Sequence, residues 1–111
     1  MVRQGDIINI DFNPGAGHEQ AGSRPAVVIS NNFFNAMAGL AIVCPITNTD
    51  KDFPLHVRLD SRSKTTGVIL SDHVKSLDVN SRGYTFIEKV PQDILESVVN
   101  KVFAEIEVQT L

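Results

Sequence analysis

The spacing of apolar residues along this chain changes at Pro91, and that change limits the folds open to it. Before Pro91, short apolar segments rich in β-branched residues alternate with polar or glycine-containing turns, a pattern typical of β-strands. After Pro91, apolar residues recur with a helical period as far as Glu107, which predicts one amphipathic helix. Strands this short and closely spaced indicate an antiparallel sheet rolled into a small barrel. We therefore expect a mainly β fold with a C-terminal helix.

Each expected element has its own sequence signal. Residues 6–12 alternate polar and apolar side chains, as a half-buried strand does, whereas 26–30 and 40–46 are continuous apolar runs that indicate strands buried on both faces. Pro91 is expected at the first helical position, and Asp93 near the positive end of the helix dipole. The remaining expected elements are strands at 53–59, 67–70 and 82–90 and a short helical turn at 31–36.

Length and cysteine content suit one small domain in a reducing compartment. The 111 residues match the roughly 100–150 of a common domain, so residues 1–111 are expected to form a single domain. The lone Cys44 excludes an internal disulfide framework and a cysteine-based zinc site, and its apolar neighbours predict a core position. No apolar run approaches the roughly 18 residues of a membrane span, and no export signal is evident, so we expect a cytoplasmic protein.

The net charge of −3 at first argues against a nucleic-acid partner, because phosphate-binding proteins usually carry an excess of basic residues. The charge is not evenly distributed, however. Residues 1–90 contain nine Lys or Arg and nine Asp or Glu, and the whole deficit lies in residues 91–111. A neutral body can still carry a basic groove, so the net charge excludes no class of partner.

The segment after the first strand holds the most unusual group of side chains in the sequence. Between residues 15 and 25, a histidine, a carboxylate, an amide, a hydroxyl and a guanidinium are interspersed with three glycines, which permit close backbone approach. Because the guanidinium directly precedes an apolar run, we expect it at the end of a strand. A solvated loop with an Arg–Glu ion pair is the alternative interpretation. The side chains belong to His18, Glu19, Gln20, Ser23 and Arg24.

Two further groups of polar side chains lie where apolar runs end. Thr47 closes the run at 40–46, where a threonine commonly caps or turns the chain. His73 and Lys75 follow the strand expected at 67–70, which puts a titratable ring and a cation at another strand end. The histidines form no metal-ligand motif and no serine sits on a glycine-flanked elbow. Neither a metal site nor a Ser-His-Asp triad is therefore supported.

Five strings carry a likeness to a known family: Gly5–Ile8, Asp11–Pro14, Gly17–Val28 with its Glu-Gln-Ala-Gly-Ser-Arg-Pro core, Pro45–Thr47 and Gly67–Asp78. In this order they resemble the MazF/PemK family of mRNA-interferase toxins over nearly the whole chain. The resemblance implies an SH3-like small antiparallel β-barrel with a C-terminal helix, and a homodimer. It also implies a cognate antitoxin protein, which we expect to have an acidic, partly disordered tail.

The resemblance further implies an endoribonuclease toxin that cuts single-stranded RNA at short sequences without a metal or other cofactor. In that reaction a 2′-hydroxyl attacks the adjacent phosphorus and leaves a 2′,3′-cyclic phosphate and a 5′-hydroxyl. By position, the family's active-site arginine and threonine fall on Arg24 and Thr47, and the acidic residue of its mobile loop falls on Glu19. Arg24 suits stabilisation of the phosphorane because its fork matches phosphate oxygens, and Glu19 or His18 would be the base.

The same resemblance suggests where RNA is bound. We expect substrate contacts from five side chains: His18, Gln20, Ser23, His73 and Lys75. Lys75 is the clearest candidate for a phosphate contact because of its charge and its location. His73 stands where relatives often have glutamine, so the cleaved RNA sequence is not expected to follow that of any one relative.

Two other functions remain open from the sequence. A non-enzymatic toxin of similar barrel fold would bind a protein target such as DNA gyrase through the end of its C-terminal helix, and Arg24 and Thr47 would then be dispensable. An SH3-like interaction module would bind a peptide through its loops. Peptide binding would not explain why the polar side chains from Glu19 to Arg24 are grouped in one segment.

Overall fold

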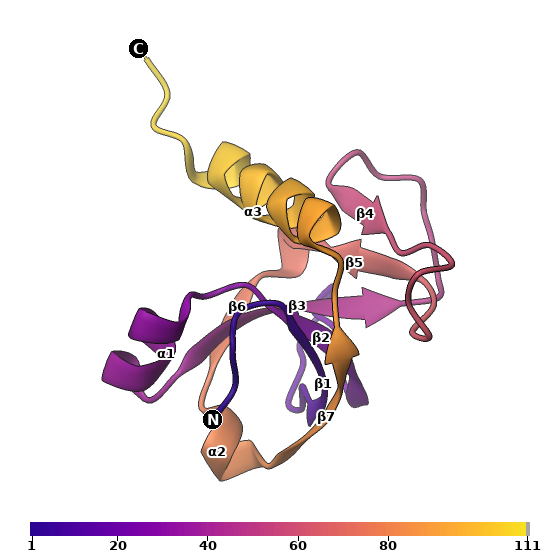
Figure 1. Ribbon diagram of the computed structural model, residues 1–111. Coiled ribbons are helices and arrows are strands. Elements are labelled where there is room, and N and C mark those ends of the chain that lie inside the picture. Colours follow the sequence, from indigo (N-terminus) through magenta and orange to yellow (C-terminus); the bar gives the residue numbers. More distant parts are fainter. Residues whose placement is uncertain (111) are drawn as a thin grey trace.

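The computed structural model describes residues 1–110, in which one long helix packs against a curved β-sheet (Figure 1). The elements in chain order are β1 (Asp6–Asp11), β2 (Ser23–Val28), α1 (Asn32–Ala38), β3 (Ala41–Thr47), β4 (His56–Arg58), β5 (Val68–Leu70), the 3₁₀ turn η1 (Ser71–His73), β6 (Lys75–Leu77), α2 (Val79–Arg82), β7 (Tyr84–Lys89) and α3 (Gln92–Ile106). The predicted mainly β fold with a C-terminal helix is confirmed.

The strands of residues 1–110 form one antiparallel sheet in the order β4-β5-β3-β2-β1-β7. β3 has two partners on the same side, because its first half pairs with β6 and its last two residues pair with β5. The sheet curves around its central strands (Figure 1), but β4, β6 and β7 each pair with a single strand and leave open edges. The predicted barrel class therefore holds, with a barrel that is open rather than closed.

The central strands β1, β2 and β3 separate two apolar cores. Neighbouring residues of a strand point to opposite faces, so Val27 belongs to one buried cluster and Val28 to the other. Burial on both faces is thus confirmed for the two continuous apolar runs. The first strand is more buried than the predicted half, since Ile7 packs in one core and Ile8 in the other.

Helix α3 covers the first of these cores. Ile94, Leu95 and Val98 are buried against the sheet, in the same cluster as Ile7 and Val27. Further along the same apolar stripe, Phe103 and Ile106 are 63% and 68% exposed. Within residues 1–110, neither α3 nor any shorter helix combines the length and the hydropathy needed to span a bilayer.

Local capping sets the ends of the helices. Pro91 is the N-cap of α3 rather than its first residue, while Asp93 lies in the first turn as predicted. Helix α1 is longer than the predicted turn. The side chain of Asn31 accepts a hydrogen bond from the amide of Phe34 at 2.8 Å, and Gly39 ends the helix with a φ of 67°.

The structure differs most from the sequence-based expectations between residues 53 and 82. The strand expected at 53–59 is only His56–Arg58, and η1, β6 and α2 were not predicted. These elements are three or four residues long, which is too short to establish a hydrophobic period. Their stability comes from neighbours distant in the sequence, as when β6 forms on β3.

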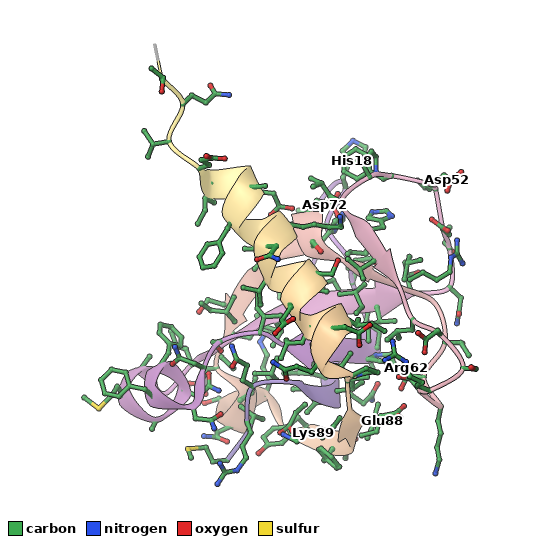
Figure 2. All side chains as sticks on the ribbon, turned by 45° about the horizontal axis from the view of Figure 1, so that its top comes forward. His18, Asp52, Arg62, Asp72, Glu88 and Lys89 are labelled. Atoms are coloured by element: carbon green, nitrogen blue, oxygen red, sulfur yellow. The ribbon has the colours of Figure 1, made fainter. Side chains whose placement is uncertain are left out.

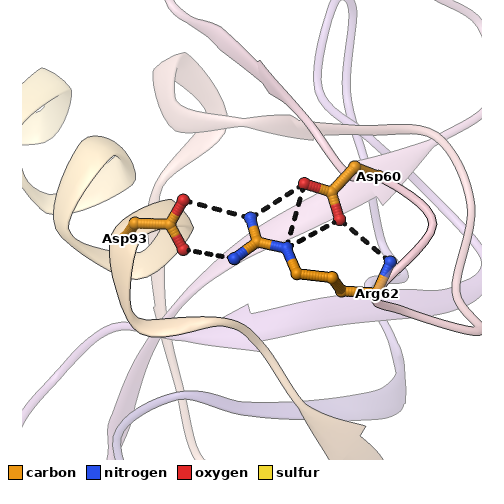
Figure 3. A network of polar contacts seen from close by, with 3 residues as sticks. All are labelled: Asp60, Arg62 and Asp93. Carbon is orange, nitrogen blue, oxygen red and sulfur yellow. Dashed lines mark hydrogen bonds and ion pairs between the residues drawn. The ribbon is translucent and has the colours of Figure 1, made fainter.

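The loop between β4 and β5 is fastened to α3 and β7. The guanidinium of Arg62 donates to both oxygens of Asp60 and, at 2.8 and 3.0 Å, to both oxygens of Asp93 at the start of α3 (Figure 3). The bonds that Asp60 accepts from the guanidinium and the amide of Arg62 lower the pKa of Asp60 to about 2. The carboxylate of Glu88 on β7 accepts from the amide of Thr65 at 2.8 Å and from its hydroxyl at 2.7 Å.

The contact between α3 and the sheet gives a prediction about stability. Leu95→Ala is expected to lower the free energy of unfolding by about 2–5 kcal/mol, because it leaves a cavity in the first core. The neighbouring Glu96→Ala, on the exposed face of α3, is the matched control and is expected to change it by less than about 0.5 kcal/mol. Urea denaturation followed by circular dichroism measures both, and equal effects would contradict the packing described here.

Candidate active site

Three segments meet on one side of the molecule: the β1–β2 loop, the end of β3 and the segment from η1 to β6. They enclose two adjoining hollows of about 350 Å³ each, which together form what we call the cleft. Figure 2 shows His18 and Asp72 near each other on this side, away from Glu88 and Lys89. His18, Gln20 and His73 line both hollows. We call one of them the Arg24 hollow; its other main lining residues are Arg24, Thr47, Lys51 and His56. We call the second the Lys75 hollow; its other main lining residues are Phe12, Glu19, Asp72 and Lys75.

Arg24 and Thr47 are brought together by the pairing of β2 with β3. Ala26 lies opposite Pro45, and the same register continued by two residues puts Arg24 opposite Thr47. Arg24 is the second residue of β2, which confirms its predicted place at a strand end. Its Nε and Nη2 donate to the carbonyl of Ala21 at 3.2 and 3.0 Å, so the guanidinium is oriented by the end of the loop.

Glu19 lies in the Lys75 hollow and is not paired with Arg24. Its Oε2 is 3.7 Å from Nζ of Lys75, and its Oε1 accepts from the amide of Ala16 at 3.1 Å. The alternative of an Arg–Glu ion pair in this loop is therefore wrong. The side chains of Glu19 and Lys75 are 51% and 33% exposed, and an ion pair so placed contributes at most about 1 kcal/mol. Another anion can therefore replace Glu19 beside Lys75.

The Arg24 hollow carries positive charge that no carboxylate neutralises directly. In the part of the chain from residue 1 to 110, neither Arg24 nor Lys51 has a carboxylate oxygen within 4.0 Å. Arg58 and Lys89, by contrast, are paired with carboxylates. Two free cations on the wall of one hollow attract an anionic ligand to it.

A histidine that the sequence analysis did not select lies in the same hollow. The His56 side chain is only 10% exposed, and its Nε2 is 3.3 Å from Oδ1 of Asp72, whose Oδ2 is 3.7 Å from Nε2 of His73. Its Nδ1 is buried and makes no hydrogen bond within residues 1–110, and the nearest oxygen of Asp50 is 4.0 Å away. The edge of Phe53 packs on the ring at a centroid distance of 5.4 Å.

Three groups that do not line the hollows have shifted pKa values. Burial raises the pKa of the Cys44 thiol to about 12, with smaller contributions from the charges of Glu105 and Asp72. A thiol in this state is a poor nucleophile, in agreement with the predicted core position of Cys44. Burial also raises the pKa of Glu105, whereas the backbone N–H of Asp52 and then Arg58 hold the pKa of Asp50 below its ordinary value.

Gly67 sets the position of Thr47. A Cβ built on Gly67 would lie 2.3 Å from the carbonyl oxygen of Thr47, and the glycine has a φ of +113°, where residues with side chains are strained. The next residue, Val68, pairs with Thr47 in the β3–β5 ladder. Only glycine allows β5 to approach the end of β3 this closely, so the backbone of β5 supports one wall of the Arg24 hollow.

The structure thus assembles most of the predicted site residues and leaves one aside. Arg24 and Thr47 share one hollow, Glu19 and Lys75 share the other, and three predicted contacts line both. Ser23, the first residue of β2, lies outside the residues that line the two hollows. Sequence reasoning missed Lys51 and His56. Their place depends on the pairing of His56 with Leu70 across β4 and β5, and no local pattern reveals that register.

The chain is similar to known proteins over nearly its whole length. The family described as PemK-like, MazF-like toxin of type II toxin–antitoxin system matches residues 3–105. The chain is 39% identical over 98 residues to the endoribonuclease toxin MazF of Escherichia coli, covering 88% of this chain and 87% of that protein. It is 32% identical over 105 residues to the endoribonuclease PemK of Escherichia coli, covering 91% and 79% of the two chains.

Solved structures give the same result for the fold. MazF from Deinococcus radiodurans superposes with a TM-score of 0.90 at 36% identity, covering 96% of this chain and 97% of that one. A MazE–MazF structure from the same organism superposes with a TM-score of 0.83 at 36% identity, covering 97% of each chain.

The contact between Gly67 and Thr47 gives a prediction that compares this glycine with Gly39, which has open space around it. Gly39→Ala, at a φ of +67° with no atom within 4 Å of the new methyl group, adds only the strain of a left-handed alanine, about 1–2 kcal/mol. Gly67→Ala adds a clash with Thr47, so the free energy of unfolding is expected to fall by about 1–3 kcal/mol more. Urea denaturation measures both variants, and equal losses would show that β5 does not press on Thr47.

Proposed function

The chain belongs to the family of PemK-like, MazF-like toxins of type II toxin–antitoxin systems, and on that basis we propose that it is an endoribonuclease toxin that a cognate antitoxin neutralises. The observation that carries the proposal is the presence of Arg24 and Thr47 together on the wall of one hollow, beside a second unpaired cation, Lys51. The substrate is single-stranded RNA, cut at a specific short sequence. We further infer that residues 1–111 are one toxin domain that works in the cytoplasm as a homodimer.

Arg24 stabilises the charge that develops during cleavage. Attack of a 2′-hydroxyl on the neighbouring phosphorus gives a phosphorane with two negative charges. The guanidinium already points its Nε and Nη2 at one oxygen, the carbonyl of Ala21, and its planar fork matches two phosphoryl oxygens equally well. Arg24 therefore binds the phosphorane as a cation.

Thr47 donates a hydrogen bond to the phosphorane, and Glu19 is the general base. The Thr47 hydroxyl, which now accepts a hydrogen bond from the amide of Thr49 at 3.2 Å, is free to donate its own proton to a phosphoryl oxygen. Glu19 takes the proton of the 2′-hydroxyl after the RNA has separated it from Lys75. That separation is easy because the ion pair is exposed and long. The released Lys75 then binds a backbone phosphate. When the phosphorane collapses, the bond between phosphorus and the 5′-oxygen breaks, and that oxygen takes a proton from solvent and leaves as the 5′-hydroxyl. No step in this scheme needs a metal ion.

Cleavage of a long single-stranded RNA in EDTA tests this scheme. The wild-type protein is expected to leave 2′,3′-cyclic phosphate and 5′-hydroxyl ends at one short sequence. Arg24→Ala and Thr47→Val are expected to slow cleavage at least about 100-fold, since each removes a donor to the transition state. Glu19→Gln is expected to slow it by about 10²–10⁴-fold, since it removes the base. End-labelled RNA and single-turnover rates provide the measurements.

Three matched variants outside the cleft control for loss of charge or of a hydroxyl. Arg3→Ala, Thr85→Val and Glu96→Gln alter exposed residues that line neither hollow, and their rates are expected to stay within about threefold of wild type. No cleavage by the wild-type protein, or cleavage that survives Arg24→Ala, would refute the enzyme. Toxicity that persists without cleavage would favour a toxin that binds a protein target.

The homodimer has its own physical support. Large apolar side chains remain uncovered on α1 and on the C-terminal half of α3, among them Phe33 and Met37, which are 76% and 73% exposed. Exposed apolar surface of this kind marks protein interfaces. Light scattering at micromolar concentration is expected to give about twice the chain mass of 12.2 kDa. A value equal to the chain mass would contradict the dimer.

A further inference from the structure

Arg82 joins α2 to the root of the β1–β2 loop, the loop that carries His18, Glu19 and Gln20. Its Nη1 donates to the carbonyl of Asp11 at 2.8 Å and to the carbonyl of Asn13 at 2.7 Å. The same nitrogen therefore binds the carbonyls of the two residues on either side of Phe12, although Arg82 lies some seventy positions further along the chain. Arg82 does not line either hollow, so the roles proposed above do not account for it.

The other polar groups at the loop root are bonded within the loop itself. The amide of Phe12 donates to the carbonyl of Gly22 at 3.0 Å, and the amide of Gly22 donates to the side-chain oxygen of Asn13 at 2.9 Å. The side chain of Asp11 accepts from the amide of Asn13 at 2.8 Å. Arg82 adds to these bonds two that tie the root to α2.

The support on which Arg82 stands is itself fixed. Helix α2, at the bottom of Figure 1, is capped by Asp78, whose carboxylate accepts from the amide and the hydroxyl of Ser81 at 3.1 and 3.0 Å. Val79 in the same helix is buried in the second core together with Phe12. Arg82 and Phe12 thus hold the loop root from two sides of one packed unit.

Phe12 connects this unit to the cleft. Its side chain is buried in the second core and also lines the Lys75 hollow, where Glu19 and Lys75 meet. A rotation of the backbone between the carbonyls of Asp11 and Asn13 would therefore move the floor of that hollow and the start of the loop together. Charge-assisted hydrogen bonds such as those from Arg82 resist this rotation better than neutral ones.

We propose that Arg82 is a positioning residue that sets the direction in which residues 14–21 leave β1, and so holds Glu19 over the cleft. The proposal rests on the proposed function, because it assigns the loop its task in RNA cleavage. Within residues 1–110 the hydrogen bonds of the Arg82 side chain go to backbone carbonyls at the loop root, which separates this role from that of a residue bound to the substrate.

Two substitutions and two readouts test the proposal. Arg82→Met removes both hydrogen bonds and keeps an unbranched, shorter apolar side chain, whereas Arg82→Lys retains one cationic nitrogen, enough for two bonds that come from one atom. Amide hydrogen exchange without RNA is expected to accelerate at least tenfold in residues 12–22 of Arg82→Met and to stay near wild type in Arg82→Lys. Single-turnover cleavage is expected to slow about tenfold in Arg82→Met at saturating RNA, with little change in RNA affinity.

Arg62→Met is the matched control, since Arg62 is another exposed arginine that ties down a loop, in this case the β4–β5 loop. It is expected to speed exchange in residues 60–67 alone and to leave cleavage unchanged. If Arg82→Met does not fold, Arg82→Gln replaces it in the same measurements.

The possible outcomes separate the proposal from its alternatives. Unchanged exchange in residues 12–22 would overturn it. Weaker RNA binding with a shallower salt dependence and unchanged exchange would make Arg82 a phosphate contact and would also overturn it. Faster exchange in a protein whose wild type cleaves no RNA would uphold the anchoring of the loop and refute the enzyme instead.

Discussion

The pairing of β2 with β3 is the interaction on which the rest of the structure depends. Both strands are buried on both faces, so their side chains alternate between two cores, and a shift by one residue would move every side chain into the core that it does not fit. The register fixed by Val27 and Val28 in turn fixes the strand ends, where Arg24 and Thr47 face each other. Packing in the interior thereby determines the spacing of the polar groups in the cleft, because close-packed side chains leave the strands little room to move.

Charge is distributed around the cleft in a way that the net value conceals. Outside the cleft, Arg58, Arg62 and Lys89 each have a carboxylate partner. Arg24 and Lys51 have none among residues 1–110, and both line the same hollow. A chain with net charge −3 therefore presents a local positive field, and the acidic residues of its C-terminal segment do not cancel that field directly.

The elements that could be predicted from the sequence are those whose own residues contain the signal. The 3.6-residue period identifies α3, and continuous β-branched runs identify β2 and β3. Arg24 and Thr47 could be assigned because each adjoins such a run and matches a family string. By contrast, β6, α2 and η1 exist because β3 and the second core receive them, and His56 reaches the cleft through the β4–β5 ladder. Pairing between segments distant in the sequence produces no recognisable pattern in segments this short.

The ion pair between Glu19 and Lys75 has a consequence for the thermodynamics of ligand binding. Any phosphate that binds Lys75 replaces a carboxylate that is already there, so the step is an exchange of one anion for another. Few counterions are released in such an exchange, whereas release is expected where a phosphate meets Arg24 or Lys51. The two hollows therefore differ in how they bind an anion. In the Lys75 hollow an incoming anion must displace the carboxylate of Glu19, whereas in the Arg24 hollow it meets two cations without a carboxylate partner among residues 1–110.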